Sequence, residues 1–297
     1  MTARSRGIGQ ALAAYLLWGL LPIYWKSLVA VPAPEILAHR ITWSFVFLAV
    51  LIGVRREWPA VRGILAHRRT LALYSVAAVL LATNWLTYIH GVNTNRIVET
   101  SLGYYINPLV SVGLGVVFLR ERLRRTQWLA ISLAGLGVAY LTIRVGHFPW
   151  IAAVLAVSFG LYGLAKKRAP AGPIPGLAFE TGVLVVPAVV TLGFWQAHGD
   201  AAFGHAGGTV TGLLLLSGFV TTVPLVWFSS AVRVIDLTTL GLLQYSSPTC
   251  GLLVGVFLYR EPFDRGRLLG FGVIWLGLAA YWLEGVWRAR ALRYAAR

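Results

Sequence analysis

Apolar residues fill ten stretches of the chain, and short clusters that hold most of the charged residues separate them. Each stretch is about 18 to 24 residues long, and about 20 helical residues cross the hydrocarbon core of a bilayer. The pattern therefore predicts an all-α polytopic membrane protein with ten transmembrane helices. The predicted spans cover about residues 8–28, 36–54, 71–90, 98–119, 127–144, 148–165, 176–195, 210–231, 237–259 and 267–287.

The spans leave only about a third of the 297 residues for loops and tails, so no segment is long enough for an independent soluble domain. Composition agrees, because only 12% of the residues are charged, against about 25% in soluble domains. The mean hydropathy is +0.72. A water-soluble enzyme is therefore excluded. The first apolar run continues to about Tyr24, too long for the core of a signal peptide, so we expect an uncleaved helix.

The formal net charge of +16 comes from basic residues in short loops and tails. Ten spans place both termini on one side of the membrane. If that side is the cytoplasm, nineteen of the 26 Lys and Arg residues flank the inner ends of the spans. Cytoplasmic loops of membrane proteins carry such an excess. We therefore expect a multi-pass protein of the cytoplasmic (plasma) membrane with both termini in the cytoplasm. The lipid bilayer, and no nucleic acid, is the partner that explains the charge.

The two halves of the chain repeat. A shift of 140 residues superposes Pro108 on Pro248, Gly115 on Gly255, Arg120 on Arg260, Glu121 on Glu261, Gly137 on Gly277 and Ala139 on Ala279. Each half contains five spans, an odd number, so the second half must cross the membrane in the opposite sense. The sequence thus predicts two inverted five-helix repeats, residues 1–146 and residues 147–297, the second with a short basic C-terminal tail. Secondary transporters often have inverted repeats and a substrate site near the midplane between them.

Two segments of the chain resemble one known family. The first contains Asn84-Trp85-Leu86-Thr87-Tyr88, Val92-Asn93 and the run from Glu99 to Leu109 with sequence ETSLGYYINPL; the second contains Leu240-Gly241-Leu242-Leu243-Gln244-Tyr245 followed by Pro248-Thr249. Both are similar to the RarD branch of the EamA, or drug/metabolite transporter, superfamily. The resemblance implies ten helices in two inverted five-helix repeats, a cytoplasmic-membrane location and a transporter role. The association of this branch with chloramphenicol sensitivity identifies no transported substrate.

Ionisable residues inside a span cost roughly 2.5 to 3.5 kcal/mol on insertion scales, so they are candidates for function. His39 and Arg40 lie near the start of the second span, and Glu180 lies about one turn into the seventh. One interpretation is that Arg40 or His39 binds an anionic or polar substrate group, while Glu180 binds a proton or a cationic group. The alternative is that all three extend to the nearer interface or neutralise loop charge. For Glu99, beside Arg96, the pattern favours a surface ion pair.

Uncharged polar residues complete the candidate substrate or coupling site, together with two prolines that predict helix kinks. The polar residues are Asn84, Tyr88, Asn93, Tyr105, Asn107, Gln244 and Tyr245, and the prolines are Pro108 and Pro248. The alternative is that the amides and hydroxyls hold helices together. Small residues four apart, such as Gly251 and Gly255, predict close helix contacts within the chain or in a homodimer.

No motif in the sequence predicts a cofactor. Cys250 is the one cysteine, no histidine pair has metal-ligand spacing on a helix, and no phosphate-binding glycine loop occurs. The predicted function is therefore a secondary transporter of a small amphipathic metabolite or drug, working by alternating access with protons or another gradient as the energy source. The alternatives are a non-transporting accessory protein or a lipid scramblase. An integral-membrane enzyme would need clustered catalytic groups, whereas the carboxylates here are scattered.

Overall fold

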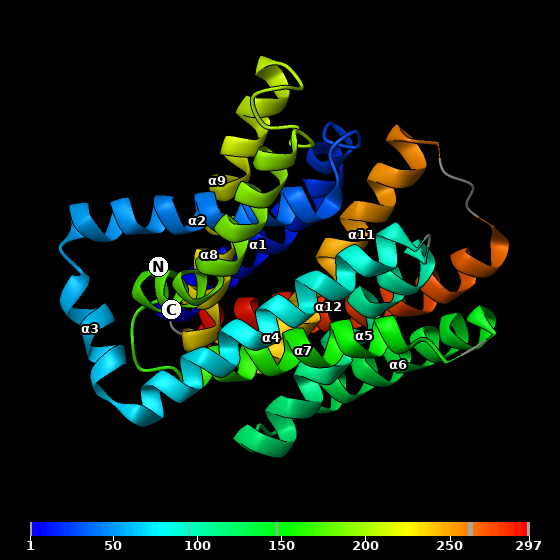
Figure 1. Cartoon of the computed structure of the whole chain (residues 1–297). Helices are drawn as coiled ribbons and strands as arrows, with labels where there is room; N and C mark the ends of the chain where they lie inside the picture. Colours follow the sequence, from blue (N-terminus) through cyan, green and yellow to red (C-terminus); the bar gives the residue numbers. More distant parts are fainter. Residues whose placement is uncertain (1, 95, 147, 261–263, 296–297) are drawn as a thin grey trace.

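The computed structural model describes residues 2–94, 96–146, 148–260 and 264–295, with the side chains of residues 92, 93, 97, 98, 145 and 285–295 left undescribed. Its described part is helical and contains no strand (Figure 1). Ten helical segments are long and apolar enough to cross a membrane, and each overlaps one predicted span. The prediction of a ten-helix, all-α membrane protein is thus confirmed.

Six helices form the first half of the chain. They are α1 (Ala3–Lys26), α2 (Ala33–Arg55), α3 (Trp58–Ala66), α4 (Arg68–Asn93), α5 (Ile97–Leu119) and α6 (Arg125–Val145). The short helix α3 lies between two predicted spans, where the apolar pattern predicts only a loop. It begins with proline in its first turn, a favoured position, and buries Ile64 beside α4 and α8.

The second half contains α7 (Trp150–Arg168), α8 (Pro173–His198), α9 (Gly208–Val234), α10 (Leu237–Gln244), α11 (Ser246–Leu253), the π-helix η1 (Val254–Leu258) and α12 (Arg265–Ala295). The ninth span is therefore divided among α10, α11 and η1. The division falls just before Pro248, whose ring nitrogen leaves the carbonyl of Gln244 without its helical partner. At the repeat-equivalent position, Pro108 lies inside α5, which continues as one α-helix.

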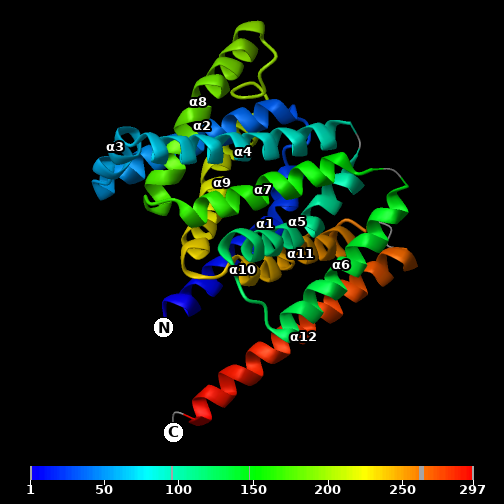
Figure 2. The ribbon, with the colours of Figure 1, turned by 90° about the horizontal axis from the view of Figure 1, so that it is seen from below.

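Helices from the two halves pack between one another. Helix α1 contacts α9, α10 and α11, while α7 contacts α4 and α5. The first membrane helix of each half therefore packs against the third and fourth membrane helices of the other half. Three pairs of equivalent helices also meet directly, α2 with α8, α5 with α10, and α6 with α12. Figure 2 shows α6 and α12 side by side at one edge of the bundle.

Ion pairs at both ends show that α6 and α12 run antiparallel. At one end the Arg124 Nη1 atom lies 3.3 Å from Glu284 Oε1, and at the other the Arg144 Nη1 atom lies 3.0 Å from Asp264 Oδ1. The residue before α6 therefore meets the later part of α12, and the end of α6 meets the residue before α12. The two pairs exchange under the 140-residue shift, with arginine always from the first half.

Glycine allows these two helices to approach closely. A Cβ atom on Gly137 would lie 2.7 Å from the carbonyl oxygen of Gly270. A Cβ atom on Gly277 would lie 2.7 Å from the carbonyl oxygen of Ala130, the repeat-equivalent contact. Both glycines therefore serve packing within the chain.

Aromatic rings fill the space between α1, α7 and α9. The Trp18 ring centroid lies 5.6 Å from that of Phe159 and 5.8 Å from that of Phe228. Tyr15 and Tyr162 extend the same cluster and are fully buried. This cluster joins α1 of the first half to α7 and α9 of the second.

Candidate functional site

Arg40 lies on α2 between aromatic rings from neighbouring helices. Its guanidinium carbon is 4.6 Å from the Trp25 ring centroid on α1 and 5.0 Å from the Trp85 ring centroid on α4. Its Nε atom donates a hydrogen bond of 3.1 Å to the Thr221 hydroxyl on α9. The rings of Tyr88 on α4 and Tyr104 on α5 lie nearby, with their centroids 6.1 Å apart. We call these five residues around Arg40 the aromatic cage.

The charge of Arg40 has no carboxylate within ion-pair distance among the described residues. The Arg40 side chain is partly buried and has therefore lost part of its hydration. The two tryptophan rings replace only some of that lost hydration. Guanidinium carries five N–H donors in a planar fork that matches a carboxylate or phosphate. Tyr104 is 38% exposed, so this residue lies at the edge of the cage. An anionic group is the chemical complement of this arrangement.

His39, although adjacent to Arg40 in sequence, belongs to a different environment. Successive helix residues point about 100° apart, and the His39 ring packs 4.8 Å from that of Phe203 in the loop after α8. The Nε2 atom of His39 lies 3.8 Å from Glu35 Oε1. The two residues that the sequence offered as alternatives for one anion site are therefore parts of two sites.

Glu180 forms a closed, buried ion pair. Its Oε1 atom lies 2.8 Å from Lys166 Nζ, and its Oε2 atom accepts a hydrogen bond of 3.0 Å from the Tyr162 hydroxyl. The side chains of Lys166 and Glu180 are 3% and 0% exposed. Neither side chain extends to the surface of the molecule. Each carboxylate oxygen already has a donor on α7, so the ion pair connects α7 to α8. In the described part of the chain, Glu180 makes no hydrogen bond or ion pair with a residue of the aromatic cage.

The polar residues of α4 and α5 have different surroundings from one another. Asn84 donates to the Leu155 carbonyl at 3.0 Å and to the Ser158 hydroxyl at 3.1 Å, so both amide hydrogens hold α4 to α7. Asn107 accepts a hydrogen bond of 3.2 Å from Ser111, one turn along α5. Both amides are buried, as is Gln244, whereas Asn93 lies outside the described side chains.

Tyr105 and Tyr245 occupy equivalent positions in the two halves and face each other. Their ring centroids are 6.4 Å apart, and the Phe271 ring of α12 lies 4.8 Å from Tyr105. Both hydroxyl oxygens are buried without a hydrogen-bond partner in the described part of the chain. The pair packs with Ala134 and Ile274, so it points toward α6 and α12. Tyr104 and Tyr88 belong to the aromatic cage, whereas Tyr105 and Tyr245 do not.

Glu99 forms the predicted ion pair, but its expected surface position is wrong. Its Oε2 atom lies 2.7 Å from Arg96, yet the side chain is only 3% exposed. The reason is that Oε1 accepts a hydrogen bond of 2.9 Å from the Ile151 N–H in the first turn of α7. A carboxylate near a helix N-terminus satisfies backbone donors that have no partner within the helix.

Glu121 has a similar role that no pattern in the sequence indicates. It accepts hydrogen bonds from the Leu237 N–H at 2.7 Å and the Thr238 N–H at 2.9 Å, at the start of α10. Glu121 and Leu237 are 116 positions apart, so local sequence carries no sign of the contact. Glu99 and Glu121 thus attach the first half to helix starts of the second.

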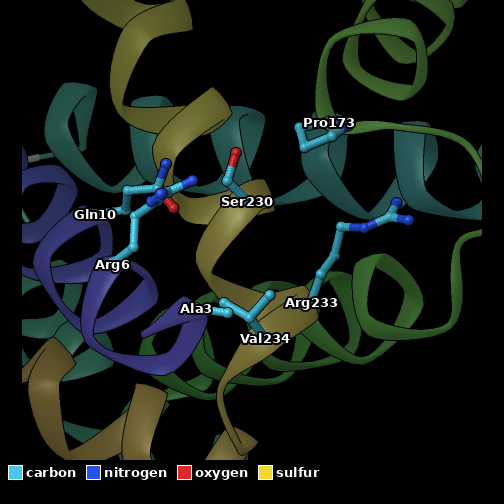
Figure 3. Close-up of a pocket in the computed structure, with 7 residues that line it drawn as sticks. All are labelled: Ala3, Arg6, Gln10, Pro173, Ser230, Arg233 and Val234. Atoms are coloured by element: carbon cyan, nitrogen blue, oxygen red, sulfur yellow. The ribbon is translucent and has the colours of Figure 1, made fainter. Parts of the chain in front are cut away.

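A surface cavity of about 290 Å³ lies at the other end of α1 (Figure 3). Arg6 and Gln10 of α1 line it opposite Ser230 of α9, and Arg233 points away from them. The Arg233 guanidinium instead donates to backbone carbonyls before α8, including that of Ala169 at 3.2 Å. Nineteen helical positions separate Arg6 from Trp25, a distance of about 28 Å at the rise of an α-helix. The cavity is therefore separate from the aromatic cage.

Comparisons with known proteins agree with this architecture. The model of the EamA-like transporter family matches the chain twice, over residues 5–143 and 149–283. An uncharacterized transporter of Pseudomonas aeruginosa is 43% identical, with 96% of this chain and 95% of that protein covered. The uncharacterized transporter YojE of Bacillus subtilis is 40% identical, with 97% of each chain covered. Protein RarD of Escherichia coli is 40% identical, with 96% of each covered.

A solved crystal structure shares the fold. It superposes with a TM-score of 0.70 over 94% of this chain and 97% of that chain, at 19% sequence identity. The resemblance seen in the two sequence segments is thus confirmed over nearly the whole length. The chain belongs to the EamA-like transporter family, in its RarD branch, and is a multi-pass membrane transporter rather than an enzyme.

Proposed function

We propose that the protein is a secondary transporter that carries a small amphipathic solute across the plasma membrane, and that Arg40 binds an anionic group of this solute. One observation carries the proposal: the Arg40 guanidinium lies among residues of α1, α4, α5 and α9 with no described carboxylate to balance it. Helix α9 belongs to the second half of the chain, and the other helices belong to the first.

The chemistry of the cage selects for two features in one molecule. The free N–H groups of Arg40 favour a carboxylate or another planar anion, because charge-assisted hydrogen bonds are roughly twice as strong as neutral ones. The rings of Trp25, Trp85 and Tyr88 favour apolar or planar surface on the rest of the solute. A solute with only one of these features would leave either the charge or the rings unsatisfied.

Alternating access is the mechanism that we propose. The repeated match of one family model, the antiparallel α6 and α12, and the equivalent contacts of Gly137 and Gly277 support two inverted halves. Residues on both halves contact Arg40, so relative movement of the halves would change access to the cage. In the proposed orientation both termini lie in the cytoplasm, and a proton gradient is the candidate energy source.

Transport in proteoliposomes tests the proposal. A panel of amphipathic carboxylates, each paired with its uncharged methyl ester, is offered to the wild-type protein and to Arg40→Gln, Arg40→Lys and Arg122→Gln. Arg122 lies on an exposed loop and controls for the loss of one positive charge. We expect at least one carboxylate to be carried in preference to its ester. Arg40→Gln should slow this uptake about tenfold or more, because a hydrogen bond to a charged group contributes about 1.5 to 3 kcal/mol.

Arg40→Lys should keep part of the activity, because it retains the charge and loses the fork of donors. Uptake of the carboxylate by Arg40→Gln at the wild-type rate would show that Arg40 does not bind the anion. If no member of the panel moves under any ion gradient, the proposed anionic, amphipathic solute is wrong.

A further inference from the structure

We infer that Glu35 and His39 form a proton-binding site that fastens the loop between α8 and α9, residues 199–207. The site is separate from the aromatic cage, because His39 and Arg40 point in different directions from α2. This proton-binding site would couple transport to a proton gradient. Only that link to transport rests on the proposed function. Proton binding and its effect on the loop are properties of the protein without any solute.

Glu35 holds the loop through its backbone. The Oε1 atom accepts hydrogen bonds from the Ala202 N–H at 2.8 Å and the Phe203 N–H at 3.2 Å. The side chain is only 1% exposed, and its second oxygen, Oε2, is buried without a hydrogen-bond partner among the described residues. One carboxylate oxygen therefore anchors the loop while the other remains available.

His39 stands beside this carboxylate in a defined tautomer. Its Nδ1 atom accepts a hydrogen bond of 3.1 Å from the Trp43 indole N–H, so we assign the hydrogen of the neutral ring to Nε2. Nε2 is buried, lies 3.8 Å from Glu35 Oε1 and has no hydrogen-bond partner in the described part of the chain. The Phe203 ring covers the imidazole at a centroid distance of 4.8 Å. Among the described residues, His39 is thus the only basic side chain within ion-pair distance of the Glu35 carboxylate.

Few other charged groups surround the site. The titratable and charged groups nearest this end of the surrounding elements are Asp200 and His205 in the loop, His198 at the end of α8, Tyr24 and Lys26 on α1, and Arg40 on α2 itself. Asp200, His205, His198 and Lys26 are exposed. Tyr24 donates to the Leu213 carbonyl, and Arg40 lies against its tryptophans. None of them forms an ion pair with Glu35 or His39 among the described residues.

The protonation state of this pair controls how firmly the loop is held. A buried carboxylate without a full cation is costly, and a proton taken from solvent onto the free oxygen of Glu35 removes that charge. The same proton converts two charge-assisted backbone hydrogen bonds into neutral ones, which are about half as strong. Proton uptake therefore loosens the loop at Ala202 and Phe203, and proton release fastens it. In the proposed orientation this loop faces the outside of the cell.

Hydrogen–deuterium exchange tests the inference on the full chain in nanodiscs. Mass spectrometry with electron-transfer fragmentation resolves the amides of Ala202 and Phe203 between pH 5 and pH 8, and each rate is divided by the intrinsic rate at that pH. We expect protection of these two amides to fall about tenfold in the wild type as the pH is lowered and Glu35 takes up its proton. Glu35→Gln should remove this pH dependence, since an amide oxygen still accepts the bonds but cannot ionise.

Two further variants make the test decisive. His39→Gln keeps an acceptor for Trp43 and should shift the midpoint of the change without abolishing it. Asp200→Asn removes an exposed carboxylate of the same loop and should match the wild type. Constant protection in the wild type, full pH dependence in Glu35→Gln, or its loss in Asp200→Asn would overturn the inference. If Glu35→Gln does not fold, the midpoints of His39→Gln and Asp200→Asn decide: an unshifted His39→Gln overturns the pair. No solute is used, so failure of the Arg40 proposal leaves this result unaffected.

Discussion

The buried pair of Lys166 and Glu180 allows a quantitative test of how the second half balances charge away from water. The Nζ and Oε1 atoms are 2.8 Å apart, and both side chains are almost completely buried. Removing one partner of such a pair leaves the other charge buried and uncompensated, which costs about 3 to 5 kcal/mol of unfolding free energy. Removing both charges is often neutral or stabilising, because neither desolvation penalty remains.

The two single variants should differ. Lys166→Met leaves the Glu180 carboxylate with only the Tyr162 hydroxyl, so we expect a loss of about 3 to 5 kcal/mol. Glu180→Gln leaves the Lys166 ammonium near the rings of Tyr74 and Tyr162, at 5.5 and 5.7 Å from their centroids. Cation–π attraction of about 0.5 to 2 kcal/mol offsets part of the penalty, which reduces the expected loss to about 1 to 4.5 kcal/mol.

The measurement is reversible unfolding in mixed micelles of increasing dodecyl sulfate content, followed by far-UV circular dichroism. The double variant Lys166→Met with Glu180→Gln should be within about 1 kcal/mol of the wild type. Arg62→Met, at an exposed position on α3, serves as the control and should change stability by no more than about 0.5 kcal/mol. If the double variant loses the sum of the single losses, the two charges are not coupled and the reasoning fails. Glu180→Gln should also keep any pH dependence of transport, since the proposed proton site is Glu35 and His39.

Two other predictions concern the relation between the halves. Gly137→Leu should destabilise the α6–α12 contact by about 1 to 3 kcal/mol, because its Cβ atom would meet the Gly270 carbonyl at 2.7 Å. Gly135→Leu is the matched control, since nothing lies within 4 Å of its Cβ position, and equal losses in the same unfolding assay would contradict the packing argument. In a Cys250→Ser background, Arg122→Cys and Arg265→Cys should react with a membrane-impermeant maleimide from opposite sides of the membrane. Labelling from one side only for both cysteines would refute the inverted topology.

The sequence predicted the helices well because spanning a bilayer is a local requirement. About 20 apolar residues in a row must form a helix in lipid, whatever their neighbours are. The helix prediction was incomplete where a helix depends on packing against distant parts of the chain. Helix α3 is only nine residues long and buries Ile64 against other helices, so its stability comes from contacts that no short window contains.

The sequence singled out Arg40 and Tyr88 as candidates, but it did not indicate the tryptophans and the threonine that lie beside Arg40. Arg40 and His39 were identified as costly residues within a span, and the helical rotation between them separates their environments. Asn84 was expected in the substrate or coupling site, and its amide holds α7 at Leu155, 71 positions away. No sequence pattern indicates a role for Glu35, because its partners, the Ala202 and Phe203 amides, lie 167 and 168 positions away.

Hydrophobicity along the chain determined the ten helices, and the 140-residue repeat and the basic loops led us to predict an inverted orientation. Only the tertiary structure decided which buried charges are paired. Lys166 and Glu180 satisfy each other, Glu99 and Glu121 satisfy helix starts, and Arg40 faces aromatic rings without an acid among the described residues. The physical reason is range: burial in lipid acts on each segment by itself, whereas compensation of a charge requires a partner that only folding brings near.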